Sequence, residues 1–304
     1  MSKYLVTGGA GFIGSALAKK LIDQGHHVTI IDNLTTGNID NVPKGSDFIN
    51  ANLQDLNLYS KLNKKFKAIY HIAGQSSGEI SFDDPVYDLQ TNTQSTLLLL
   101  KFAKESGCRR FIYASSMSVY GDQPNLPISE KYSCNPKSFY GVGKMASEHY
   151  LRIYQSYGIQ STALRLFNVY GPGQNMQNLR QGMVSIFLAM AIKDKFIHIK
   201  GSLERFRDFI FIDDVVNAFI NIESNKNSFA KIYNVGTGVR TSIKILLNEL
   251  ISTIPFSINY KVEGGTAGDQ HGIYADINLM KDEIGWESKI KLKDGLKRMV
   301  KDIL

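Results

Sequence analysis

Apolar runs of strand length recur along roughly the first half of the chain. They are rich in β-branched and aromatic side chains, as strands buried on both faces are. Most of them are separated by a stretch long enough for a helix, which is the arrangement that builds a parallel sheet. The pattern predicts strands at Tyr4–Thr7, His27–Ile31, Ala68–Ile72, Arg110–Ala114 and Ser161–Leu166.

The segments between these runs have apolar residues at helical spacing. They predict helices over Ile13–Gln24, Gln90–Glu105 and Ser138–Tyr157. A repeated strand–helix–strand order indicates the α/β class, with a doubly wound parallel sheet of the Rossmann type.

The regular alternation ends after Tyr170-Gly171-Pro172-Gly173, where shorter elements and longer loops begin. We therefore expect a first domain over residues 1–170 and a smaller C-terminal α/β lobe over residues 171–304. Part of residues 208–240 is expected to return to the first domain.

The composition excludes several other classes of protein. With 304 residues, 43% of them hydrophobic, the chain can bury a full core. The net charge of +7 is spread along the chain, which favours small phosphorylated ligands over nucleic acid. No signal-peptide pattern or apolar run of membrane-spanning length is present, so we expect a cytoplasmic, soluble protein with no membrane partner. Cys108 and Cys134 have no CxxC spacing, so we expect free thiols and no metal site.

A glycine-rich turn links the first predicted strand to the first predicted helix. Gly8, Gly11 and Gly14 stand where a dinucleotide-binding turn needs them. The first permits the tight turn, the second allows the backbone to approach a pyrophosphate, and the third allows close packing of helix on strand. The helix N-terminus then faces the phosphates.

Asp32 ends the second predicted strand, where a carboxylate can accept the hydroxyls of an adenosine ribose. It would repel a 2′-phosphate, and no Lys or Arg occurs between Asp32 and Thr36. The sequence therefore predicts NAD as the cofactor.

Tyr140 and Lys144 are four residues apart and share one helix face. A tyrosine with a pKa of about 10 is a poor base at neutral pH, but a nearby ammonium group favours its phenolate form. Ser116 follows a predicted strand at the edge of the sheet where parallel sheets place their sites. Its hydroxyl is the candidate to orient a sugar oxygen for Tyr140. His71, at another strand end, is expected to be structural.

Taken together, motifs spread over almost the whole chain resemble the extended short-chain dehydrogenase/reductases, and within them the NAD-dependent sugar-nucleotide epimerase/dehydratase family. These motifs are Thr7–Ser15, Asp32-Asn33-Leu34, His71-Ile-Ala-Gly74, Ser115–Gly121, Tyr140–Lys144, Leu164–Pro172, Arg207–Asp214, Tyr274-Ala-Asp276 and Gly285-Trp286.

The resemblance implies a role for each matching position. Ser116, Tyr140 and Lys144 would form the catalytic triad, with Tyr140 as base. Asn168 and Arg207 would bind the substrate diphosphate, and the helices around Leu89–Glu105 and Ser138–Tyr157 would pair in a homodimer. The positions that match cofactor contacts are Gly8, Gly11, Phe12, Ile13, Gly14, Asp32, Asn33, Leu53, Ala73, Gly74, Asn92, Tyr140, Lys144 and Phe167.

Departures from the family's patterns bear on the reaction. Dehydratase relatives carry an Asp-Glu pair where this chain has Met117 and Ser118. Decarboxylase relatives usually read Val-Val-Ser-Asn-Phe where this chain has Met183-Val-Ser-Ile-Phe187, and Ser76–Glu79 does not match their carboxylate-handling loop. C4 epimerisation of a nucleoside-diphosphate hexose is the prediction that remains. A 4-dehydrogenase or 4-ketoreductase is the alternative enzyme, and a non-catalytic NAD-binding scaffold is the alternative outside enzymes.

The nucleotide and the sugar stay open. Epimerase relatives usually have a second diphosphate-binding Arg in an Arg-x-Gly-Asp/Glu pattern, and this chain has Thr266-Ala-Gly-Asp269. Asp269 is kept as a substrate-binding candidate. Arg180, Arg205 or Lys200 could supply the missing positive charge.

Overall fold

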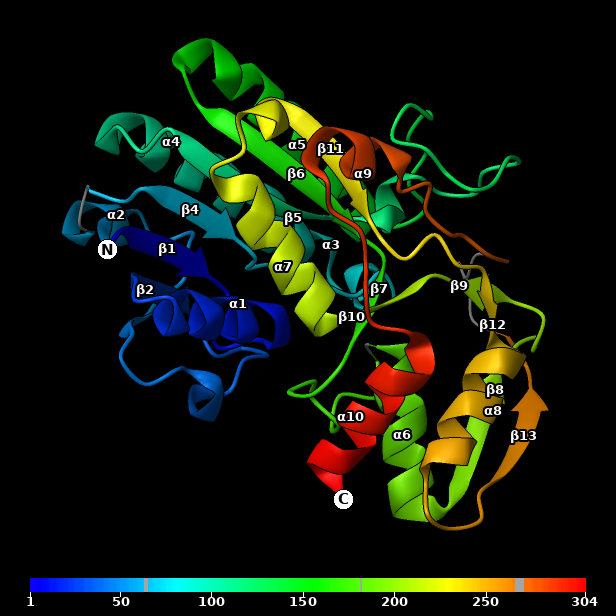
Figure 1. Ribbon diagram of the computed structural model, residues 1–304. Coiled ribbons are helices and arrows are strands. Elements are labelled where there is room, and N and C mark those ends of the chain that lie inside the picture. The colour runs from blue at the N-terminus through cyan, green and yellow to red at the C-terminus, as the bar shows by residue number, and fades with distance from the viewer. Residues whose placement is uncertain (63–64, 181, 266–270) are drawn as a thin grey trace.

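The computed structural model describes residues 1–62, 65–180, 182–265 and 271–304. Its centre is a seven-stranded parallel sheet with the strand order β11-β6-β5-β4-β1-β2-β3 (Figure 1). The order runs outward in both directions from the junction of β1 and β4, which is the doubly wound arrangement that the sequence predicts. The strands are β1 (Lys3–Thr7), β2 (His27–Asp32), β3 (Asp47–Asn50), β4 (Ala68–His71), β5 (Arg110–Ser116), β6 (Gln160–Leu166) and β11 (Lys231–Val235).

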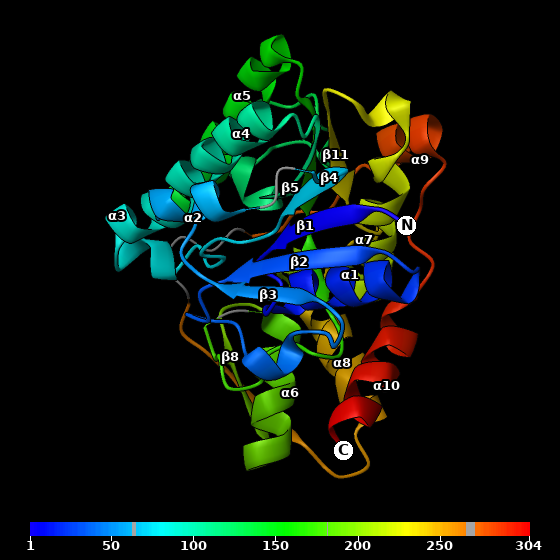
Figure 2. The ribbon, with the colours of Figure 1, turned by 90° about the vertical axis from the view of Figure 1, so that its left-hand side faces the viewer.

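Helices cover both faces of this sheet. On one face lie α1 (Phe12–Asp23) and α7 (Ile212–Glu223), and on the other lie α2 (Leu56–Lys61), α4 (Ser95–Ser106) and α5 (Phe139–Tyr154) (Figure 2). Successive side chains of a strand point to opposite faces. Accordingly, Tyr4 and Val6 pack in the core beneath α1 and α7, while Leu5 packs in the core beneath α4 and α5.

The helix predicted over Gln90–Glu105 is not one regular helix. A short helix, α3 (Pro85–Asp88), leads into a π-helical segment, Leu89–Gln94, and α4 follows from Ser95. The predicted helix is therefore present, but it begins earlier, at Pro85, and residues 89–94 are π-helical. The wider turn places Asn92 inside the protein, where it is 1% exposed.

The smaller lobe consists of short strand pairs and three helices of the described chain, and it lies to one side of the main sheet (Figure 1). Strand β7 (Asn168–Tyr170) pairs with β10 (Phe209–Phe211), β8 (Phe196–Lys200) with β13 (Asn259–Glu263), and β9 (Phe206–Arg207) with β12 (Thr241–Ser242). The helices are α6 (Met183–Asp194), α8 (Ile243–Thr253) and α10 (Leu292–Ile303). Helix α9 (Asn278–Ile284) instead packs against β11 of the main sheet (Figure 1).

Two parts of residues 208–240 lie against the main sheet. Helix α7 packs beside α1, and β11 pairs in parallel with β6 at the edge of the sheet. Among the described residues, no helix is long and apolar enough to cross a membrane.

Candidate active site

The glycine turn has the geometry expected of a phosphate-binding turn. Gly8 has φ of 72°, and a Cβ there would lie 2.7 Å from the backbone nitrogen of Ala73. A Cβ on Gly14 would overlap the carbonyl oxygen of Gly8. Gly11 is the N-cap of α1, and no side chain caps the amides of that helix. The turn can therefore bring unshielded backbone N–H groups close to a pyrophosphate.

Asp32 is held against this turn. Its Oδ2 accepts a hydrogen bond from the backbone of Ala10 at 3.0 Å, and its Oδ1 accepts one from Leu34 at 2.9 Å. A carboxylate has about four acceptor positions, so both oxygens can still accept ribose hydroxyls. Beside it, the Asn33 amide donates to Asn52, next to the buried Leu53.

Asn92, Gly74 and Lys144 meet at the end of β4. A Cβ on Gly74 would overlap Oδ1 of Asn92 and would lie 3.6 Å from Nζ of Lys144. That Oδ1 is buried and has no hydrogen-bond partner among the described residues. An acceptor left open here fits a cofactor that donates a hydrogen bond, so the residues present fit NAD.

The three predicted catalytic residues come together although Ser116 lies on β5 and the other two lie on α5. The Ser116 hydroxyl donates to the hydroxyl of Ser118 at 3.2 Å and is close enough to the phenol of Tyr140 to lower its pKa. The Lys144 ammonium donates to the carbonyl of Ala114 at 3.0 Å and lies 5.6 Å from the centre of the Tyr140 ring. Each of the three side chains is buried, and each lines the same cavity.

Burial acts against the charged form of both titratable members. Burial raises the pKa of Tyr140 to about 12, while the nearby Ser116 hydroxyl acts in the opposite direction and lowers it. Burial also lowers the pKa of Lys144 to about 8, against the charges of Asp88 and Glu148, which raise it. These two carboxylates therefore favour a charged Lys144. Neither carboxylate is among the site residues predicted from the sequence, although Glu148 lies one turn beyond Lys144 on the same helix.

A cavity of about 590 Å³ extends from the first turn of α1 past the triad into the smaller lobe. Its wall includes Phe12 and Ile13 of α1 and Phe167 after β6. It also includes Asn168 and Arg207, the two predicted diphosphate contacts. Its remaining polar and charged lining includes Ser76, Ser77, Glu79, Ser118, Lys137, Gln174, Arg180, His198, Lys200 and Arg205.

Arg207 lies on β9, where it is 5% exposed. Its Nη1 donates to the carbonyl of Phe206 at 2.8 Å. Burial, with a smaller effect from the charge of Arg205, lowers the pKa of Arg207 to about 10, so its guanidinium stays charged at neutral pH. Asn168 donates to the carbonyl of Asp208 at 3.1 Å. The candidates Thr266 and Asp269 lie outside the described residues.

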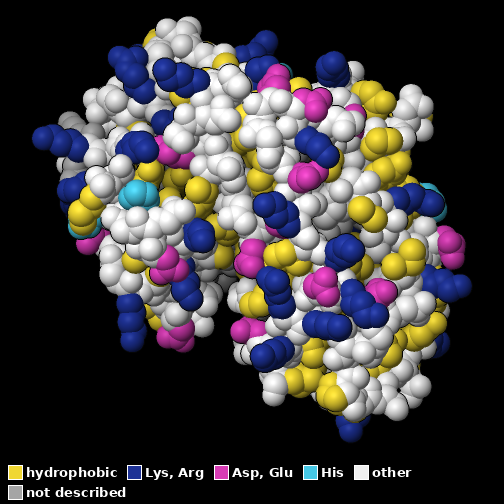
Figure 3. Space-filling model, in the orientation of Figure 1, with side chains coloured by type: hydrophobic (Ala, Val, Ile, Leu, Met, Phe, Trp, Pro, Cys, Tyr) yellow, Lys and Arg dark blue, Asp and Glu magenta, His cyan; other side chains and the backbone are white. Residues whose placement is uncertain are grey.

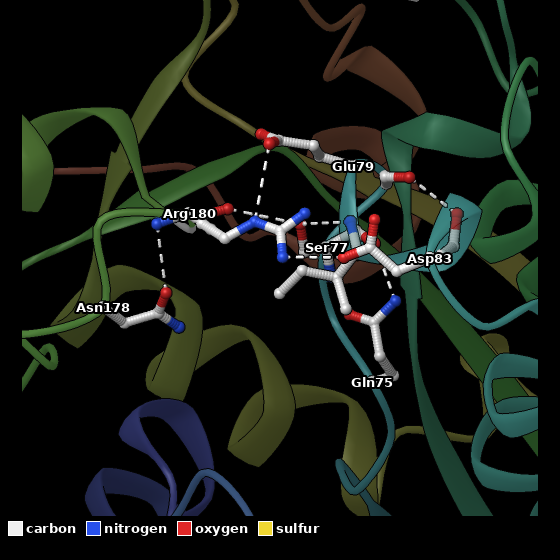
Figure 4. Close-up of polar contacts among 9 residues, drawn as sticks. Gln75, Ser77, Glu79, Asp83, Asn178 and Arg180 are labelled. Atoms are coloured by element: carbon white, nitrogen blue, oxygen red, sulfur yellow. Dashed lines mark hydrogen bonds and ion pairs between the residues drawn. The ribbon is translucent and has the colours of Figure 1, made fainter.

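Arg180 is one of the three basic residues that could supply the missing positive charge, and it lines the cavity. Its guanidinium forms ion pairs with Glu79 at 3.4 Å and with Asp83 at 2.7 Å (Figure 4). Its carbonyl accepts a hydrogen bond from Ser77. Two loops distant in sequence are thereby joined at the cavity, and Arg180 already has two carboxylate partners.

Comparisons with known proteins agree with this geometry. The family model described as the NAD-dependent epimerase/dehydratase family matches residues 4–236. The chain is 37% identical to a putative UDP-glucose 4-epimerase of Methanocaldococcus jannaschii, over 97% of this chain and 96% of that one. The UDP-glucose 4-epimerase structure of Thermotoga maritima, solved with UDP-glucose, superimposes with a TM-score of 0.94 at 33% identity and covers 99% of this chain and 98% of that one.

A UDP-glucose 4-epimerase of Thermus thermophilus, solved in complex with NAD, superimposes with a TM-score of 0.90 at 30% identity, covering 99% of this chain and 98% of that one. Relatives with other activities also match: a UDP-glucuronic acid decarboxylase of Arabidopsis thaliana is 32% identical over 99% of this chain and 69% of its own length, and a dTDP-4-dehydro-6-deoxyglucose reductase of Escherichia coli is 31% identical over 98% and 96%. The family model and the NAD complex of the Thermus thermophilus relative indicate NAD as the cofactor, in agreement with the glycine turn and Asp32. The chain belongs to the NAD-dependent epimerase/dehydratase family.

Proposed function

We propose that this protein epimerises a nucleoside-diphosphate hexose at C4 through a 4-keto sugar, with Tyr140 as the base. The observation that carries the proposal is the meeting of Ser116, Tyr140 and Lys144 in one cavity that continues to the buried cation Arg207. Relatives named UDP-glucose 4-epimerase support the same reaction.

The division of the chain would follow its architecture, with the NAD site in residues 1–170 and most of the substrate site in residues 171–304. NAD, when bound, supplies the reversible oxidation of the sugar. The backbone of the glycine turn would hold its pyrophosphate and Asp32 its adenosine ribose. The other residues proposed to contact it are Phe12, Ile13, Asn33, Leu53, Ala73, Gly74, Asn92, Tyr140, Lys144 and Phe167.

In the proton transfer, the Tyr140 phenolate takes the proton of the sugar C4 hydroxyl and later returns it. Ser116 holds the same sugar oxygen by a hydrogen bond. Lys144, whose ammonium lies 5.6 Å from the centre of the Tyr140 ring, would stabilise the phenolate by its positive charge. Its bond to the carbonyl of Ala114 fixes the ammonium group beside the ring.

The substrate diphosphate would be bound by Arg207 and Asn168. Arginine suits this role because its planar guanidinium donates charge-assisted hydrogen bonds to phosphate oxygens. Lys200 and Arg205 line the same cavity. They would supply the positive charge that epimerase relatives have in a second diphosphate-binding arginine. Asp269 remains a proposed substrate contact.

The residues beside Ser116 favour epimerisation over elimination. Met117 and Ser118 occupy the positions where dehydratase relatives have an acid and a base, and both line the cavity. Neither side chain is a carboxylate, so loss of water from the hexose would lack its catalysts. Epimerisation needs only the triad, NAD and room for the 4-keto sugar to turn.

A 4-ketoreductase is the second candidate, because the dTDP-sugar reductase relative matches nearly the whole chain. A panel of UDP-, GDP-, CDP- and dTDP-hexoses, analysed by NMR, separates the two. Inversion at C4 without net NADH supports the epimerase. Stoichiometric NADH formation or consumption would support the redox enzyme, and no turnover with any sugar would favour a non-catalytic scaffold.

We also propose a homodimer built on the outer face of α3, the π-helical segment, α4 and α5. This face carries large apolar side chains that are between 37% and 65% exposed: Val86, Leu89, Leu97, Phe139, Val142 and Ile153. Helices α3 and α4 both contact α5 on the same side of the main sheet, so the elements that carry these side chains form one layer (Figure 2). A second copy of the chain would bury it.

A further inference from the structure

His71 lies at the carboxyl end of β4 and is fully buried. Its two ring nitrogens have different partners. Nδ1 lies 2.8 Å from the hydroxyl oxygen of Thr7, and Nε2 lies 2.9 Å from that of Thr96. His71 is absent from the cavity wall, so it does not reach a substrate.

The partners of the two threonines determine the direction of each hydrogen bond. The Thr96 hydroxyl donates to the carbonyl of Asn92 at 2.6 Å, so it must accept from Nε2 of His71. The Thr7 hydroxyl oxygen accepts from the backbone nitrogens of Ile72 and Ala73, which leaves its hydrogen for Nδ1. His71 is therefore neutral, with its proton on Nε2.

Burial, and to a smaller extent the charge of Lys144, lower the pKa of His71 to about 3. A proton on Nδ1 would also face the hydrogen of the Thr7 hydroxyl. Charge and geometry thus favour the same protonation state across the neutral pH range.

The groups that His71 connects belong to the proposed cofactor site. Thr7 directly precedes Gly8, the first residue of the glycine turn. Thr96 holds the carbonyl of Asn92, and Ser147 of α5 donates to that same carbonyl at 3.2 Å. Ser147 lies on the buried face of α5, less than one turn from Lys144.

We propose that His71 is a positioning residue for NAD: its neutral Nε2–H form joins the glycine turn to Asn92 and to the helix that carries Lys144, and so sets the spacing between them. The inference rests on the proposed roles of those residues. A hydrogen-bonded chain that crosses β1, β4, α4 and α5 connects the two ends of the cofactor site without touching the ligand.

The first test uses the wild-type protein with NAD bound, labelled with ¹⁵N at histidine. The expected two-dimensional NMR spectrum contains one imidazole with its proton on Nε2 and with shifts that do not change between pH 5 and pH 8. The signal is assigned by its disappearance in His71→Gln or His71→Phe. A proton on Nδ1, or titration of this imidazole in that range, would overturn the inference.

The second test measures NAD retained per chain after gel filtration, and the NAD dissociation constant. His71→Phe and Thr96→Val each break the chain of hydrogen bonds at a different point. Leaving one buried polar group unpaired is expected to weaken NAD binding by about tenfold. Tyr70→Phe is the matched control, since it removes a buried hydroxyl from the same strand that has no hydrogen-bond partner among the described residues.

Loss of thermal stability with unchanged NAD affinity in the folded variants would show that His71 only packs the core, and would reject the positioning role. Because NAD content is measured without a sugar substrate, the result does not depend on which reaction the enzyme catalyses. Failure of the epimerase proposal is therefore distinguishable from failure of this one.

Discussion

The proposed chemistry depends on the hydroxyl group of Tyr140. Replacing Tyr140 with Phe keeps the buried ring but removes the base, and a general base contributes about 10²- to 10⁴-fold to the rate. We expect Tyr140→Phe to lose epimerisation by that factor while retaining NAD. The rate is measured by NMR and bound NAD by absorbance and mass spectrometry.

Tyr154→Phe, on the same helix, is the control and should have wild-type activity, because Tyr154 is not part of the cavity wall. A Tyr140→Phe variant with near-normal activity would contradict the assignment of the base.

The neutral His71 also predicts how stability changes with pH. Its pKa is lowered in the folded protein to about 3, below its ordinary value of 6.5. Below pH 6.5 the unfolded chain therefore binds a proton that the folded protein does not, and stability from this group falls as the pH decreases.

His71→Gln removes this contribution. The difference in unfolding free energy between wild type and His71→Gln should shrink by about 1 kcal/mol between pH 7 and pH 5.5. Urea unfolding at the two pH values measures it. A difference that stays constant would mean that His71 titrates alike in the folded and unfolded states.

At the scale of elements, a buried ion pair joins α5 to the sheet. The Glu148 carboxylate accepts from Arg165 of β6 at 2.9 and 2.6 Å and from the hydroxyl of Ser115 of β5 at 2.6 Å. Both charged side chains are at most 5% exposed. The Glu148 carboxylate thus ties the helix that carries Tyr140 and Lys144 to β6 by the ion pair, and to β5, which carries Ser116, by the hydrogen bond from Ser115.

Glu148→Gln would leave the buried Arg165 charge without its partner, which typically costs about 3 to 5 kcal/mol. We expect a loss of unfolding free energy of that size in urea titrations. Glu105→Gln is the matched control: it breaks the exposed pair with Lys101 on α4, and such pairs contribute at most about 1 kcal/mol. Equal small losses in both variants would show that the buried pair does not hold α5.

At the scale of the whole molecule, the proposed homodimer would be built on the outer face of α3 to α5. Ile153→Glu places a charge in the proposed dimer interface, and we expect the variant to elute as a monomer where the wild type elutes as a dimer. Light scattering coupled to gel filtration measures the mass. Ile245→Glu on α8 is the control, because Ile245 is similarly exposed but lies in the other lobe. A monomeric wild type would refute the dimer.

Charge at this scale is distributed over the surface. On the face seen in Figure 3, Lys and Arg side chains occur over both lobes and are interspersed with Asp and Glu. The buried Arg207, in contrast, sits inside the cavity. Arg207, the cation proposed to bind phosphate, is therefore buried in the cavity and is not part of this surface pattern.

The parts of the fold and site that the sequence predicts are those set by neighbours along the chain. Five strands, the turn around Gly8 and the shared helix face of Tyr140 and Lys144 follow from periodicity and spacing. Strand β3 was missed because it is a short edge strand with no fully buried residue to form an apolar run.

The features that only the tertiary structure decided are contacts between residues that are far apart in sequence. The π-helical turn at Asn92 is supported by Ser147 from another helix, and Arg180 is held by carboxylates about a hundred residues earlier. The protonation state of His71 needs Thr7 and Thr96 together. Periodicity carries no information about such contacts, because a side chain's partners depend on which elements pack together and not on its position along its own helix or strand.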